Sequence, residues 1–154
     1  MKIFWLAFIT LLVSCTKDNE TEDQASKTDH ITSAEWKYDN GGIDADKNGS
    51  IDLSFGSGIV PACVLDNTVT FNKDGSGIAE DGAVKCDVSI PEPTQFNWSF
   101  SNNETKLNIL GSGVFGTGGQ FDILILNENQ LSLRKDTTMP GTQVPVWMVV
   151  ELKH

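Results

Sequence analysis

Alternation of apolar and polar residues is the strongest pattern in the chain, and it runs from about residue 33 to the C-terminal end. Phe96, Trp98 and Phe100 alternate with Asn97 and Ser99, so an extended backbone here has one apolar and one polar face. Helical periodicity is weak across the same region. The alternation, divided by turn residues, predicts strands at 34–38, 68–72, a return strand through 78, 84–88, 96–100, 106–110, 121–126, 130–134 and 146–152.

These predicted strands, about eight in number, follow one another closely and are joined by short turn signals, which is typical of an all-β domain. The segment 39–42 is predicted to end the first strand, and the Gly-rich run 111–119 to form a hairpin loop at a rim. The segment 121–126 is apolar on both faces and is predicted to be central. The pattern favours an antiparallel barrel or sandwich, and closure into a barrel would remove exposed edges.

The N-terminal segment is typical of a signal peptide. Lys2 precedes an apolar run over residues 3–13, which is too short to span a bilayer comfortably. Leu12-Val13-Ser14-Cys15 resembles the lipobox of bacterial lipoproteins, which implies cleavage that removes residues 1–14 and acylation of Cys15. Two or more acyl chains hold a protein stably on a membrane. The alternative is an N-terminal membrane anchor that stays uncleaved.

Residues 15–32 are predicted to be the lipidated cysteine and a disordered tether. The stretch 16–30 has almost no apolar residue, so it cannot offset the entropy lost on folding. Its start, Cys15-Thr16-Lys17-Asp18-Asn19-Glu20, resembles the export signal that sends some Bacteroidetes lipoproteins to the cell surface. We therefore expect a protein anchored by lipid to the outer membrane, with the periplasmic face and the cell surface both open.

Charge and residue types exclude several classes of function. The net charge of −10 argues against binding to nucleic acid, because contacts to phosphate need Lys and Arg. His30 and His154 are the only histidines, and neither lies within the predicted strands, which argues against Ser-His and Cys-His catalysis. A carboxylate pair is not excluded, but no spacing selects one. We expect residues 33–154 to form one monomeric domain that is not an enzyme.

Cys63 and Cys86 remain as a pair once Cys15 is assigned to lipidation. An exported chain folds where disulfides form, so an even pair predicts one bridge. Metal binding is the rival interpretation. It would need further soft ligands, and the two histidines lie in the tether and at the chain terminus.

The segment 44–52 contains oxygen ligands at the spacing of a calcium-binding loop. Asp44, Asp46, Asn48, the Ser50 carbonyl and Asp52 fit positions 1, 3, 5, 7 and 9 of the EF-hand pattern, with a glycine at position 6. Position 12 holds Phe55 instead of an acid, and the flanking segments are not helical. The loop is thus a candidate Ca²⁺ site of weak affinity, and the alternative is an Asx-rich surface turn.

Four features follow one another along the chain: Glu35-Trp36-Lys37, then Asp44-Ala45-Asp46-Lys47-Asn48-Gly49, then Cys63-Val64-Leu65-Asp66-Asn67 leading into Thr70-Phe71-Asn72-Lys73-Asp74-Gly75-Ser76-Gly77, and last Cys86 followed by Phe96-Asn97-Trp98-Ser99. In this order they resemble the lipocalin-like domain of Bacteroidetes lipoproteins, over roughly residues 33–152. The resemblance implies a small up-and-down β-barrel with one open mouth. It implies no particular ligand.

Two functions remain open after these exclusions. The first is a lipid-anchored barrel that binds a small apolar or amphipathic ligand in its mouth. Its candidate ligand-binding residues are Phe96, Trp98, Phe100 and, as a lid in the Gly-rich run, Phe115. The alternative is a non-catalytic envelope or surface protein with a filled barrel, which meets a partner or has a structural role. The two differ in whether the barrel interior contains a cavity.

Overall fold

The structure, a computed structural model, describes residues 25–56, 60–86, 93–114, 116–139 and 141–154. No helix among these residues is long and apolar enough to cross a membrane. The elements are α1 (Lys27–Ile31), β1 (Trp36–Asp44), β2 (Leu53–Ser54), α2 (Ala62–Leu65), β3 (Thr68–Phe71), β4 (Ser76–Glu80), β5 (Thr94–Ser101), β6 (Lys106–Val114), β7 (Thr117–Leu126), β8 (Gln130–Thr138) and β9 (Pro145–Lys153).

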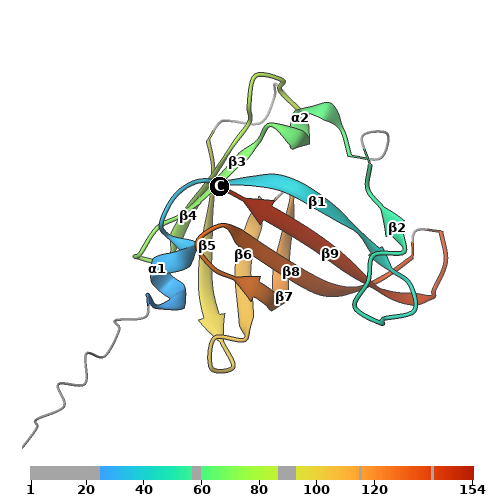
Figure 1. Cartoon of the computed structure of the whole chain (residues 1–154). Coiled ribbons are helices and arrows are strands. Elements are labelled where there is room, and N and C mark those ends of the chain that lie inside the picture. Colours follow the sequence, from blue (N-terminus) through green and yellow to red (C-terminus); the bar gives the residue numbers. More distant parts are fainter. Residues whose placement is uncertain (1–24, 57–59, 87–92, 115, 140) are drawn as a thin grey trace, which may run out of the picture.

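Eight of the strands close into an antiparallel barrel, as the sequence predicts (Figure 1). From β3 to β9 each strand pairs with the next along the chain. β1 joins β3 through the pair Trp36–Val69, and it closes the sheet against β9 from Lys37–Lys153 to Asp44–Trp147. The two-residue β2 adds to the far half of β1. The prediction of a small all-β up-and-down barrel is confirmed.

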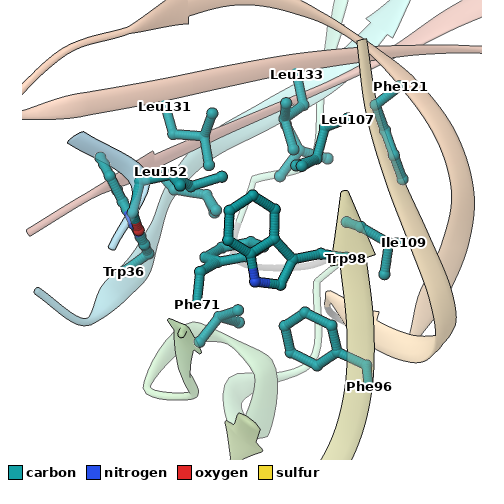
Figure 2. Close-up of a cluster of buried hydrophobic side chains, with 13 residues drawn as sticks. Trp36, Phe71, Phe96, Trp98, Leu107, Ile109, Phe121, Leu131, Leu133 and Leu152 are labelled. Atoms are coloured by element: carbon teal, nitrogen blue, oxygen red, sulfur yellow. The ribbon is translucent and has the colours of Figure 1, made fainter. Parts of the chain in front are cut away.

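The inward faces of the strands meet in an aromatic core around Trp98 (Figure 2). The Trp98 ring packs edge-on against Phe71 and Phe100, with centroids 5.5 and 5.3 Å apart. Its indole Nε1–H donates to the carbonyls of Asn72 and Ser76, at 3.1 and 2.9 Å. A buried indole therefore has the polar partner that it needs, and the β3–β4 turn is fixed to β5.

Phe96 lies against two glycines of neighbouring strands. A Cβ atom added at Gly77 would lie 2.2 Å from the Phe96 ring, and one at Gly113 would lie 2.1 Å from it. No side chain fits at such distances. The glycines in β4 and β6 therefore leave the space that the Phe96 ring occupies, and part of the Gly-rich run serves packing.

One end of the barrel is covered by α1. The fully buried Ile31 of α1 packs in the core, and its carbonyl accepts a 2.8 Å hydrogen bond from the Trp36 indole. Ser26 and Asp29 cap the helix reciprocally, forming a capping box. The folded part thus begins before the expected boundary at residue 33, and the tether prediction for 15–32 is wrong over the helix. One buried apolar residue and a good cap suffice to order this polar segment.

The other end carries α2, which lies opposite α1 in Figure 1. The predicted disulfide is confirmed, since Cys63 in α2 is bonded to Cys86 after β4. The same connection is held by the Asp66 carboxylate, which accepts from the Val84 N–H at 3.3 Å, and by the Asn67 side chain, which accepts from the Gly82 N–H at 3.1 Å. The Cys-x-x-Asp-Asn motif therefore joins α2 to the segment after β4.

Four local predictions need correction. Residues 39–42 do not end the first strand, because β1 continues to Asp44 through a bulge between Tyr38 and Asn40. Of the predicted strand 84–88, residues 84–86 form a loop, since the Val84 and Cys86 N–H groups donate to the Asp66 and Asp81 carboxylates, and residues 87–88 lie outside the described residues.

The Gly-rich run is not a long loop, because β6 extends to Val114 and β7 starts at Thr117. The segment 121–126 is not buried on both faces. A bulge in β7 leaves Leu124 and Ile125 43% and 41% exposed.

Removal of the disulfide tests how much α2 depends on it. Closing a loop with a sequence separation of 23 residues stabilises a protein by roughly 3 kcal/mol in the chain-entropy model. We expect the double variant Cys63→Ser/Cys86→Ser to lose about that free energy of unfolding, measured by urea denaturation. Reductant should destabilise the natural chain and leave the double variant unchanged. A natural chain insensitive to reductant would contradict a stabilising bridge.

Candidate functional site

A pocket of about 260 Å³ lies at the α2 end of the barrel. The segment before α2 and the helix itself form one wall, while strands β1, β7 and β9 form the others. Nearly all of its lining side chains are apolar, and they come from five separate segments: Tyr38, Phe55, Val60, Pro61, Val64, Thr117, Met148 and Val150. An apolar recess with few polar groups is the usual form of a small-molecule site.

Tyr38 places a polar group in this pocket. Its hydroxyl would lie 3.3 Å from a Cβ atom added at Gly41, so the phenol reaches along β1 toward the α2 end. Burial raises the pKa of the Tyr38 phenol, and the negative charges of Glu151 and Asp39 raise it further. Tyr38 is the single tyrosine of the chain, so its ionisation can be observed without overlap.

The predicted ligand-binding residues lie elsewhere. Phe96 and Trp98 are buried in the aromatic core, and Phe100 packs against the same core, so none of the three lines the pocket. Phe115 and Cys15 lie outside the described residues. The pocket residues carry no local sequence signal, because only barrel closure brings β1, β7, β9 and the segment before α2 together.

The predicted calcium loop does bring acids together. Carboxylate oxygens of Asp44, Asp46 and Asp52 lie within 4.8 Å of one another. Asp44 is fully buried and accepts from the backbone N–H groups of Asn48 and Gly49, at 3.1 and 2.8 Å. The arrangement could hold a metal ion, because each carboxylate retains lone pairs beyond those that accept from the backbone.

The other two predicted ligands shape the loop. The Asn48 side-chain oxygen accepts from the Ser50 N–H at 2.8 Å, and its amide donates to Asp46 at 2.9 Å. Asp52 accepts from the Ala45 N–H at 2.8 Å. The Asn48–Ser50 bond is that of an Asx turn, and the Asp52–Ala45 bond joins the two ends of the loop, so the loop is ordered by its own side chains.

A polar opening lies beside the apolar pocket, where β7 and β8 separate. Their pairing runs from Leu126–Leu131 to Asp122–Arg134 and is not continued between 117–121 and 135–138. A polar pocket of about 240 Å³ occupies this place, lined by Lys106, Gln120, Asp122, Arg134, Lys135 and Asp136. Side chains therefore bridge the two strands where the backbone ladder ends.

Asp122 joins three strands across this opening. It pairs with Lys106 of β6 and, at 2.9 Å, with Arg134 of β8. Hydrogen bonds from Lys106 and then from Arg134 hold the pKa of the Asp122 carboxyl below its usual range. The Arg134 guanidinium also stacks over the Trp147 ring at 3.8 Å, which fixes it on the outer face of the barrel.

No protein-family model matches the chain, and no curated protein matches it either. The resemblance to lipocalin-like lipoproteins therefore rests on the sequence motifs between residues 33 and 152 alone. The barrel is compatible with that resemblance.

Acid should weaken the contribution of Asp122 to stability. Because its folded-state pKa is depressed, the contribution is complete above the unfolded pKa of about 3.9 and is lost as pH falls through the folded pKa. We expect Asp122→Asn to cost about 1 kcal/mol at pH 7 and much less at pH 2, by denaturant titration at each pH. Glu128→Gln, in the exposed β7–β8 turn, is the control. A cost that does not change with pH would contradict the ion-pair account.

Proposed function

We propose that the chain is a lipid-anchored lipocalin-like protein that binds a small apolar or amphipathic ligand in the pocket at the α2 end. The observation that carries the proposal is the apolar pocket between Tyr38, Met148 and Val64. The pocket is formed by strands of the barrel together with α2 and the segment before it, as expected for a ligand site in the mouth of a small barrel.

The filled and hollow parts of the barrel divide along its axis. The aromatic core lies toward α1 and the pocket toward α2, and Val150 belongs to both. At about 260 Å³ the pocket is near the lower limit for small-molecule sites, roughly 300 Å³. It therefore suits a small ligand or one end of a longer chain.

The pocket lies at the end of the barrel opposite α1, the first described element of the chain. The Lys27 ammonium of α1 donates to the Glu104 carbonyl in the β5–β6 turn, at 2.6 Å, whereas α2 is bonded to the β4–β5 connection. These two connections are at opposite ends of β5. With lipid at Cys15, the proposed anchor would connect to the barrel through α1, at the end opposite the pocket.

Blocking the pocket tests the proposal. We expect the neutral apolar probe N-phenyl-1-naphthylamine to bind the chain, with a rise in fluorescence and a further rise in the Tyr38 pKa as the phenol loses water. Val64→Phe places a larger side chain in the pocket and should weaken binding by about tenfold, since misfit of a few methylenes costs roughly 1–3 kcal/mol.

Leu65→Phe is the matched control, because Leu65 is the next residue of α2, is exposed, and does not line the pocket. It should leave probe affinity unchanged. Failure of the natural chain to bind apolar probes would reject the ligand-binding proposal and favour the alternative of a partner-binding or structural barrel.

A second proposal concerns the loop 44–52, which we propose binds Ca²⁺ as a structural ligand. The observation that favours it is the clustering of the Asp44, Asp46 and Asp52 carboxylates. Ca²⁺ takes oxygen ligands, and a loop without an acid at position 12 resembles weak extracellular sites, with Kd of roughly 10⁻⁴–10⁻³ M.

Calcium should raise stability if the loop binds it. At a Ca²⁺ concentration ten times Kd, the free energy of unfolding should rise by about 1.4 kcal/mol, measured by thermal or urea denaturation. Asp46→Asn should abolish the rise. Asp74→Asn, in the exposed β3–β4 turn, should preserve it. An equal response in both variants would show that the ion acts on net charge and not at the loop.

A further inference from the structure

Lys135 faces the interior of the barrel at the opening between β7 and β8. Its ammonium lies 5.3 Å from the ring centroid of the buried Phe121, and a Cβ atom added at Gly119 would lie 3.0 Å from its Nζ. It donates to the Gly118 carbonyl. Gly119, with a φ of +111°, leaves the space in which the ammonium sits.

The same ammonium lies beside the apolar pocket. Lys135 is the β8 partner of Met148, which lines the pocket, and Gly118 follows the pocket residue Thr117. Lys135 also lines the polar opening. The Lys135 side chain therefore lies between the apolar pocket and the polar pocket.

The charge of Lys135 is not balanced by an acid within the described part of the chain. Asp122 is held by Lys106 and Arg134, and Asp136 is held by Lys47. None of the ion pairs among the described residues includes Lys135. An ammonium has three donors, so the bond to the Gly118 carbonyl leaves two for a ligand.

Asp39 and Glu151 lie near enough to Tyr38 to raise the pKa of its phenol. Asp39 is itself paired with Lys153, and Glu151 accepts a hydrogen bond from the Asn40 amide, so neither acid lines the pocket as a free charge. Within the described part of the chain, the Lys135 ammonium is thus the charge that would orient a ligand with one anionic end.

Building on the ligand site proposed above, we propose that its ligand is an anionic amphiphile, whose acidic headgroup pairs with Lys135 while its apolar part fills the pocket. The headgroup enters between β7 and β8, where the backbone ladder is interrupted. A carboxylate fits the described donor, the Lys135 ammonium. Lys135 gives preference for an anionic headgroup, whereas the apolar lining of the pocket supplies affinity for the apolar part of the ligand.

Two probes of equal chain length separate charge from apolar contact. Decanoate and 1-decanol are titrated against the protein at pH 7.5. Binding is followed by calorimetry or by displacement of N-phenyl-1-naphthylamine. We expect decanoate to bind about tenfold more tightly than decanol, the usual order for a charge-assisted hydrogen bond. Lys135→Met, which keeps an unbranched apolar stem, should bring the affinity for decanoate down to that for decanol and leave decanol affinity unchanged.

Lys73→Met is the matched control, since it removes one positive charge from the β3–β4 turn near α1. It should preserve the preference for decanoate. If the natural protein bound decanoate and decanol equally, the proposed role of Lys135 would be rejected, whatever the result for Lys135→Met. The proposed ligand pocket would still be supported. Loss of the preference in Lys73→Met would overturn the role of Lys135 too, by showing an effect of net charge. Binding of neither probe would reject the pocket itself.

Discussion

The pairing of β1 with β9 is the constraint on which the rest of the structure depends. It runs from Lys37–Lys153 to Asp44–Trp147 and joins the first strand of the sheet to the last. Without it, both strands would expose unpaired edges. Closure also fixes which residues face inward, since Trp36, Val150 and Leu152 all enter the core from these two strands.

Closure creates an interior that the side chains fill unevenly. The half near α1 holds the largest aromatic rings, and the buried Ile31 covers it. The half near α2 is covered by a helix of four residues that has no buried residue of its own. The disulfide and the Asp66 and Asn67 hydrogen bonds hold this cover in place where apolar packing is scarce.

Alternation was enough to predict the fold, because side chains of a strand point to opposite faces whatever the tertiary context. The disulfide followed from residue counting. The pocket could not be predicted, since Tyr38, Val64 and Met148 carry no local signal and meet only through closure. The helix α1 did have a signal, the Ser26–Asp29 capping box, but its polar sequence favours disorder. Gly77 is part of a turn motif in sequence and packs Phe96 in space.

The opening between β7 and β8 is a place where the barrel wall lacks a continuous backbone ladder. Beyond the Asp122–Arg134 pair, side chains replace the backbone ladder: Lys106 and Arg134 bridge through Asp122, and Lys135 reaches the Gly118 carbonyl. The two strands are therefore held together here by side-chain contacts and not by a continuous backbone ladder. The opening lies next to the apolar pocket, because Lys135, which lines the polar opening, pairs across β8 and β9 with the pocket residue Met148.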